Sequence, residues 1–156
     1  KGTLFLPQLL MSAEAAKAAF EIVQNAMSGE DRPKQGAVVL ATVKGDIHDI
    51  GKNIVKVLLE NYSFEVADLG RDVAPEAIVE AASRPGVKLV GLSALMTTTV
   101  VSMEETTRQL RSACPQVKIV VGGAVLTPAY ADQIGADCYV KDAMATVRYA
   151  KEVYGL

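Results

Sequence analysis

The chain has 156 residues, of which 50% are apolar and 22% are charged, and its formal net charge is −2. This length and composition are typical of one globular domain with its own core, which excludes a mainly disordered chain and a disulfide-held miniprotein. Lysine and arginine nowhere occur three in a row, so we expect no nucleic-acid partner, because such a partner requires a concentrated basic surface. No apolar run approaches the length of a membrane span, and we expect a cytoplasmic protein that does not contact membranes.

The first segment indicates a helix and a linker. Apolar residues recur at spacings of three and four over residues 7–28, which predicts an amphipathic helix. Glycine and proline interrupt the polar stretch over residues 28–36. We therefore divide the chain into residues 1–35 and an α/β domain over residues 36–156. The sequence starts with Lys1 rather than methionine, so we also expect a fragment of a longer protein.

From residue 37 onward, apolar runs alternate with helical patterns. Strands are predicted over residues 37–43, 64–68, 89–93, 117–121 and 137–140. Helices are predicted over residues 49–60, 75–83, 99–113, 127–134 and 142–154. Strands that are buried on both faces have continuous apolar sequences. The pattern therefore predicts an α/β fold: a five-stranded parallel sheet with helices on both faces, in the flavodoxin-like order 2-1-3-4-5.

Ligands of such sheets bind beyond the carboxyl ends of the strands, where the strand order reverses. The loop after the first predicted strand carries Asp46 and His48, which is the one histidine of the chain. Asp46 is placed to accept a hydrogen bond from the inner ring nitrogen of His48, and the outer nitrogen is then free to bind a metal. A structural or simply exposed histidine is the alternative interpretation.

A metal bound by His48 would need further ligands. The sequence has no second histidine, and Cys114 and Cys138 lack Cys-x-x-Cys spacing and are expected to be reduced core thiols. A single axial imidazole therefore indicates a metal that a macrocycle already holds. Phosphate-loop and dinucleotide-binding glycine patterns are absent from the sequence, which disfavours a nucleoside triphosphate or NAD.

Two further strand ends carry small or polar residues. Gly122 and Gly123 follow the fourth strand, where glycine lets a ligand approach the backbone, although a plain turn also needs glycine. Ser93 ends the third strand, and the threonines at 97–99 come next. An ordinary strand end and a helix cap are the alternatives for these residues.

Taken together, Asp46-x-His48-x-x-Gly51, Ser93-x-Leu95 and Gly122-Gly123 resemble the pattern of cobalamin-binding domains in the family of methionine synthase and the small methyltransferase corrinoid proteins. The resemblance implies a bound cobalamin or related corrinoid in its methyl form. It implies that His48 is the lower axial ligand of cobalt in place of the cofactor's own base, the base-off state. Asp46 and Thr99 then form a catalytic relay with His48; methionine synthase has serine where this chain has Thr99.

The resemblance also assigns residues to a slot for the nucleotide tail of the cofactor. These are Asp49, Ile50, Gly51, Asn53, Ser93, Leu95, Thr97, Gly122 and Gly123.

The segment before the α/β domain resembles the end of a helical cap. Leu4-Phe5-Leu6-Pro7 and the helix after it match the cap that precedes methyl-transferring members, so residues 1–35 are a cap remnant. The resemblance implies a methyl carrier that does not turn over alone. Its partners are a substrate:corrinoid methyltransferase and a second methyltransferase with a pterin or thiol acceptor. The alternative for this segment is that it packs on the sheet domain or forms a homodimer.

Three other functions stay open at this point. One is the cobalamin domain of an adenosylcobalamin-dependent mutase, and another is a non-enzymatic corrinoid sensor or storage protein. The last is a flavin-binding or receiver-like module with the same fold.

Overall fold

The computed structural model describes residues 34–156 together with residues 11, 15, 18, 19 and 22. The chain divides into two compact units, Lys1–Pro33 and Lys34–Leu156. The helix predicted over residues 7–28 and the cap remnant lie largely outside the described residues.

One parallel sheet forms the centre of the second unit. Its strands are β1 (Gly36–Thr42), β2 (Phe64–Asp68), β3 (Val87–Ser93), β4 (Lys118–Gly122) and β5 (Cys138–Val140). Their order is β2-β1-β3-β4-β5, which confirms the predicted order. Thr42 pairs with Ser93, and Ser93 pairs with Gly122. The carboxyl ends of β1, β3 and β4 therefore lie side by side where the strand order reverses.

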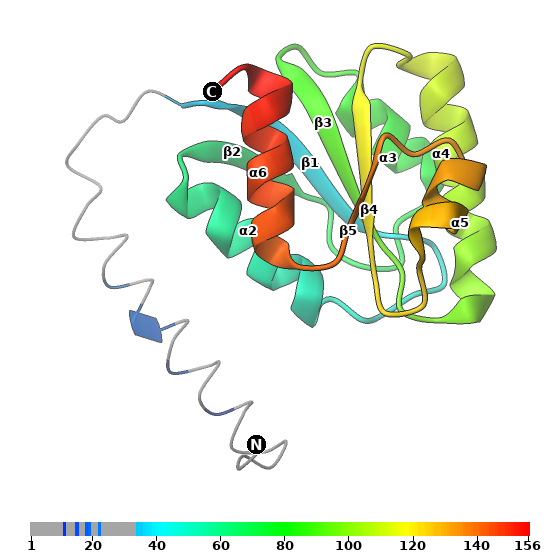
Figure 1. The fold of residues 1–156 in the computed structure, drawn as a ribbon, viewed down its shortest axis with the longest axis horizontal. Coiled ribbons are helices and arrows are strands. Elements are labelled where there is room, and N and C mark those ends of the chain that lie inside the picture. Colours follow the sequence, from blue (N-terminus) through cyan, green and yellow to red (C-terminus); the bar gives the residue numbers. More distant parts are fainter. Residues whose placement is uncertain (1–10, 12–14, 16–17, 20–21, 23–33) are drawn as a thin grey trace. The chain divides into compact units, whose positions relative to one another are not determined.

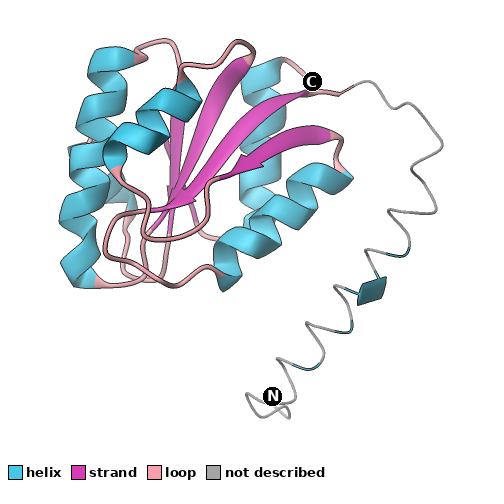
Figure 2. Cartoon of the chain, turned by 180° about the vertical axis from the view of Figure 1, so that it is seen from behind, coloured by secondary structure: helices cyan, strands magenta, loops and turns pink. Residues whose placement is uncertain are grey.

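Helices cover both faces of this sheet. They are α2 (Ile50–Asn61), α3 (Pro75–Ala82), α4 (Val100–Ala113), α5 (Pro128–Gln133) and α6 (Ala143–Tyr154), with a short 3₁₀ helix, Thr97–Thr99, before α4. The helices α3, α4 and α5 pack on one face, and α2 and α6 pack on the other. Figures 1 and 2 show the sheet between these two layers from opposite sides. The predicted strands and helices of this unit agree with the observed bounds to within two residues.

Side chains of each strand alternate between two cores. In β1, Val39 and Ala41 belong to the core under α3, α4 and α5, whereas Val38 and Leu40 belong to the core under α2 and α6. This is the two-residue period of a strand. Because both faces are covered, neither set of positions is polar, and the strand sequences are continuously apolar.

Tyr154, the last residue of α6, closes the amino end of the sheet. Its hydroxyl accepts a hydrogen bond from the backbone N–H of Lys88 (2.9 Å) and donates one to the carbonyl of Ala37 (2.5 Å). Its ring occupies the space that a side chain at position 36 would need, since a Cβ on Gly36 would lie 2.2 Å from it. The end of α6 thus joins the starts of β1 and β3.

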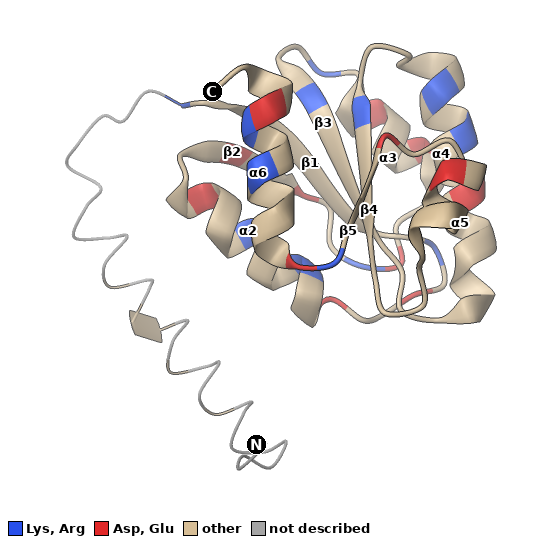
Figure 3. Ribbon diagram, viewed as in Figure 1, with Lys and Arg blue, Asp and Glu red and all other residues tan. Residues whose placement is uncertain are grey.

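Charged side chains of both signs are interspersed over the helices and loops of this unit (Figure 3). Asp137, at the start of β5, is held by ion pairs with Arg111 and Lys118 and accepts a hydrogen bond from the backbone N–H of Ile119 (2.8 Å). Burial alone would raise the pKa of Asp137, but these partners outweigh it and lower the pKa. Within the described residues, we find no helix with the length and apolar character that a membrane span requires.

Candidate functional site

The loop between β1 and α2 places the Asp46 carboxylate against the His48 ring. Oδ1 of Asp46 accepts a hydrogen bond from the backbone N–H of His48 (2.9 Å) and lies 2.8 Å from its ring Nδ1. Asp46 is fully buried, whereas the side chain of His48 is 45% exposed. A carboxylate can only accept, so in the neutral imidazole Nδ1 carries the hydrogen and Nε2 keeps its lone pair. The pair therefore presents one unprotonated nitrogen as a ligand.

The second carboxylate oxygen of Asp46 anchors the loop after β3. Oδ2 accepts hydrogen bonds from the backbone N–H groups of Leu95 (2.7 Å) and Met96 (3.3 Å) and from the hydroxyl of Thr99 (2.8 Å). Burial alone would raise the pKa of Asp46, but the hydrogen bonds from Leu95, His48 and Thr99 hold this pKa well below its usual range. Asp46 is therefore ionised at neutral pH, and it joins the predicted relay residues His48 and Thr99.

Further bonds position the backbone of the His48 loop. Oδ1 of Asp72 accepts a hydrogen bond from the backbone N–H of Gly45 (2.8 Å), and the backbone N–H of Asp72 donates to the carbonyl of Asp46 (2.9 Å). The hydroxyl of Thr42 donates to the carbonyl of His48 (3.2 Å). Gly45 has a φ of 83°, a left-handed conformation that favours glycine. These bonds hold the loop from two other places in the chain, the end of β1 and the loop after β2.

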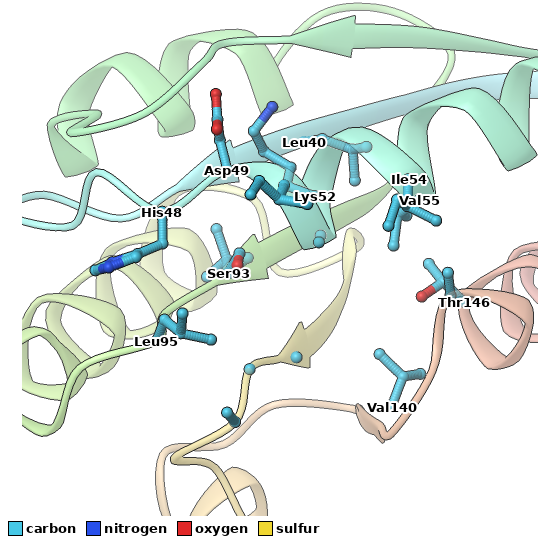
Figure 4. Close-up of a pocket in the computed structure, with 18 of the residues that line it drawn as sticks. Leu40, His48, Asp49, Lys52, Ile54, Val55, Ser93, Leu95, Val140 and Thr146 are labelled. Carbon is cyan, nitrogen blue, oxygen red and sulfur yellow. The ribbon is translucent and has the colours of Figure 1, made fainter. Parts of the chain in front are cut away.

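A cavity of about 810 Å³ lies beside His48, bounded by α2, α6 and one face of the sheet. Alternation along β3 and β4 directs Gly91, Ser93 and Gly122 to this face, and their small size leaves the hollow. A Cβ at Gly91 would lie 2.6 Å from Cδ2 of Leu40, so a larger residue there would require the Leu40 side chain to shift. In Figure 4, the cavity lies between His48 on one side and Val140 and Thr146 on the other.

The structure brings most of the predicted slot residues to this cavity. Those that line it are Asp49, Ile50, Gly51, Ser93, Leu95, Gly122 and Gly123, and the predicted metal ligand His48 also lines it. Gly123 has a φ of 151°, and a Cβ there would lie 1.8 Å from the carbonyl oxygen of Ala94. This close approach of two loops allows only glycine.

Two predicted slot residues do not reach the cavity. Thr97 is exposed and lies outside the lining, because the chain turns away after Met96 into the 3₁₀ helix. Asn53 also lies outside the lining, and its side-chain oxygen accepts a hydrogen bond from Nζ of Lys52 (2.7 Å). The structure therefore gives neither residue a place in the slot.

Sequence reasoning missed the far wall of the cavity and its inner end. The residues concerned are Leu40, Val55, Val120, Tyr139, Val140, Lys141, Asp142, Ala143 and Thr146, among others. The sequence did indicate some of these residues, those that follow the fifth strand. The predicted strand order places the fifth strand beside the fourth, so residues after the fifth strand were candidates for the same edge.

A buried ion pair holds α2 in place as the near wall. The side chain of Lys52 is 2% exposed, and its Nζ lies 2.6 Å from Oδ1 of Asp68 at the end of β2. Burial alone would raise the pKa of Asp68, but the hydrogen bonds from Lys52 and the backbone N–H of Gly70 outweigh it and lower the pKa. The pair ties the first turn of α2 to the edge strand of the sheet.

The fold and the site together define a doubly wound α/β domain that presents one imidazole nitrogen beside a deep, mostly apolar slot. Residues 36–148 match the family model described as the B12 binding domain, and the chain belongs to this family. Dimethylamine corrinoid protein 1 of Methanosarcina mazei is 44% identical to it over 156 residues, which cover 98% of this chain and 72% of that protein.

Solved structures show the same similarity. The Methanosarcina barkeri monomethylamine corrinoid protein has a TM-score of 0.76 at 32% identity, over 96% of this chain and 72% of that chain. The methanol:cobalamin methyltransferase complex of the same organism gives 0.77 at 30% identity, over 99% of this chain and 59% of that chain. The predicted fold class, the corrinoid-binding family and the corrinoid cofactor are confirmed. The flavin-binding and receiver-like alternatives are wrong.

Proposed function

We propose that this chain carries a methyl group on the cobalt of a bound corrinoid, with Nε2 of His48 as the lower axial ligand in place of the cofactor's own base. The observation that carries the proposal is the Asp46–His48 pair at the mouth of the slot. The bound corrinoid supplies a cobalt ion that accepts and gives up the methyl group. A corrin ring would itself hold the metal, so one protein nitrogen, that of His48, would be the donor that the cofactor requires.

Asp46 controls the state of the His48 ring. Its buried negative charge keeps the hydrogen on Nδ1 and makes Nε2 a better electron donor. Thr99 holds the carboxylate from the opposite side and keeps it aligned with the ring. The relay therefore holds the ring in the orientation that leaves Nε2 unprotonated and free to bind.

The slot fits the nucleotide tail of a cofactor whose base is displaced from cobalt. Gly91, Ser93 and Gly122 leave the sheet face open, so a flat group can lie directly on the strands. At the mouth, the side chains of Ile47 and Ile50 are large, apolar and 62% exposed. Burial of such side chains under a corrin ring removes them from water and favours binding.

Comparison with the relatives supports partner methyltransferases. One similar solved structure is a methanol:cobalamin methyltransferase complex, and 99% of this chain aligns with one chain of it. One curated relative is a dimethylamine corrinoid protein. We infer that this chain passes its methyl group between a substrate:corrinoid methyltransferase and a second methyltransferase. A homodimer through residues 1–35 stays a prediction.

Electron paramagnetic resonance of the Co(II) form tests the ligand. In a protein that is labelled with nitrogen-15 and loaded with unlabelled corrinoid, the hyperfine splitting from the axial nitrogen should be a doublet instead of the triplet of the unlabelled protein. The His48→Ala variant should show no response to labelling. An unchanged triplet in the labelled protein would mean that the cofactor's own base is bound, and His48 would not be the ligand.

Turnover experiments test the carrier role. The Co(I) form of the loaded protein should accept methyl groups from methylamines or methanol only after a partner methyltransferase is added. Repeated turnover by the isolated protein would show that it is an enzyme in its own right.

A further inference from the structure

Asp72 lies in the loop after β2 and has a left-handed backbone conformation. Its φ is 54°, a region that residues with a side chain seldom adopt. Within the described residues, Ser63 in the turn between α2 and β2 is the other non-glycine residue with a positive φ. The side chain of Asp72 is 48% exposed and belongs to neither core. Packing therefore does not explain the conformation, which points to a local task.

The bonds of Asp72 lead to the segment that carries Asp46. Its Oδ1 accepts a hydrogen bond from the backbone N–H of Gly45 (2.8 Å), and its own backbone N–H donates to the carbonyl of Asp46 (2.9 Å). Oδ1 also lies 3.0 Å from Nζ of Lys44. Asp72 thus holds Gly45 and Asp46 with one side chain and one backbone group.

Gly45 needs outside support because glycine has more backbone freedom than any other residue. Asp46 follows it directly, and the two oxygens of its carboxylate face different partners. One oxygen meets His48, and the other accepts from Leu95 and Thr99 on the loop after β3. A shift of the segment that contains Gly45 and Asp46 would therefore disturb both sides of the carboxylate at once.

We propose that Asp72 is a positioning residue for the cobalt ligand: by holding the N–H of Gly45, it sets how tightly Nε2 of His48 binds cobalt. This inference rests on the proposed function, in which His48 is the lower ligand. Asp72 does not line the cavity, so it acts through the loop. Loss of a group that orients a metal ligand typically weakens metal binding about 10–100-fold. We expect about tenfold here, because Asp72 acts on His48 through Asp46.

The accepting oxygen of Asp72 carries this role, and its charge does not. The N–H of Gly45 and the ammonium of Lys44 meet the same oxygen, Oδ1. An asparagine amide keeps one accepting oxygen and tolerates the left-handed region, so Asp72→Asn should keep the parent affinity. The ion pair between Lys44 and Asp72 is exposed, and exposed pairs contribute little. Lys44→Gln should therefore change the affinity by less than about twofold.

A double-mutant cycle with His48 separates positioning from general stability. Equilibrium dialysis measures the Kd of the full chain for cobinamide in its Co(II) form. Cobinamide has no base, so its axial nitrogen can come only from the protein. Asp72→Gly keeps the left-handed conformation accessible but removes the acceptor, and we expect the Kd to rise about tenfold. In the His48→Ala background, the same substitution should leave the Kd unchanged, because no ligand remains to be positioned.

The matched control is Ser63→Gly, which makes the same kind of change at a positive φ before the first residue of β2, at the other end of the sheet. It should leave the Kd unchanged. Asp72→Ala also lacks the acceptor, and it replaces Asp72→Gly if that variant does not fold.

The outcomes separate the two proposals. Equal Kd values for the parent chain and His48→Ala would overturn His48 as the ligand and the role of Asp72 with it. If His48→Ala binds more weakly but Asp72→Gly binds like the parent chain, the role of Asp72 alone is overturned. An equal rise of the Kd in both backgrounds would mean that Asp72 only stabilises the fold, which also overturns its positioning role.

Discussion

Replacing Asp46 with asparagine tests the hydrogen-bond network that positions His48. Both oxygens of Asp46 are saturated: Oδ1 faces the backbone N–H and ring Nδ1 of His48, and Oδ2 faces the donors of Leu95, Met96 and Thr99. An amide has the same shape but only one accepting oxygen. Its NH₂ group must therefore replace an acceptor on one of the two sides.

The loss can be worked out for each orientation. With NH₂ at the Oδ2 position, three donors lose their acceptor; with NH₂ at the Oδ1 position, only the backbone N–H of His48 does. The second orientation is therefore favoured. One charge-assisted bond is worth about 1.5–3 kcal/mol, and the remaining bonds weaken because their acceptor is no longer charged. We expect Asp46→Asn to lower the free energy of unfolding of the cofactor-free protein by about 2–4 kcal/mol.

The favoured orientation also changes the histidine. An amide NH₂ donates to Nδ1, so the hydrogen of the neutral ring moves to Nε2 and this nitrogen can no longer bind cobalt. The response of the Co(II) spectrum to nitrogen-15 should therefore weaken or disappear in the variant.

Urea unfolding measures the first effect, and electron paramagnetic resonance measures the second. Asp132→Asn, which changes an exposed carboxylate on α5, is the control and should alter stability by less than about 0.5 kcal/mol. If Asp46→Asn were as stable as this control, the account of the network would be refuted. A full nitrogen-15 response in the variant would refute the account of the tautomer.

Three other substitutions test separate parts of the structure. Thr99→Val should lower the free energy of unfolding by about 2 kcal/mol, because a buried carboxylate loses a donor, and Thr99→Ser should restore most of it; equal urea midpoints for the two variants would contradict this. Asp68→Ala removes the ion-pair partner of the buried Lys52 ammonium and leaves it the side-chain oxygen of Asn53, so the change should cost about 3 kcal/mol. Adding Lys52→Met should recover part of that loss, and no recovery in thermal unfolding would argue against the buried pair. The pKa of Asp137 is lower in the folded protein than in the unfolded chain. Its ionised carboxylate therefore stabilises the fold above the unfolded-state pKa of about 3.9, and this stabilisation is lost as the pH falls through the pKa of the folded state. The stability gap between the parent chain and Asp137→Asn should therefore be full at pH 7 and shrink below about pH 4, whereas a constant gap would count against the ion pairs.

The parts of the fold that the sequence predicts are those with strong local patterns. Continuous apolar runs mark the strands because both faces of the sheet are covered, as Val38 and Val39 show by entering opposite cores. The alternation of strands and helices then restricts the order, and the order identifies the strand ends where ligands bind. Asp46 and His48 were predictable for the same reason, since they are neighbours in sequence and in space.

The remaining features depend on packing between distant segments. Thr97 was placed in the slot because it follows Ser93 closely, but the turn at Met96 directs it to solvent. Thr146 looks in the sequence like any polar residue of an amphipathic helix. It becomes a cavity residue only because the first half of α6 faces Gly91 and Gly122, where the sheet lacks side chains. The role of Thr146 as a cavity residue therefore depends on the residues of the sheet that face it, which its own sequence neighbours do not indicate.

The helix α6 touches both ends of the sheet. Thr146 lies in the cavity near the carboxyl ends of the strands, and Tyr154, eight residues later, bonds to Ala37 and Lys88 at the amino ends. The two residues are separated by about 12 Å of helix, and a helix of this length opens and closes as a unit. A ligand that binds only the closed form lowers the population of the open form everywhere along that unit. Amide hydrogens at the starts of β1 and β3, remote from the cofactor, should therefore exchange more slowly once the slot is filled.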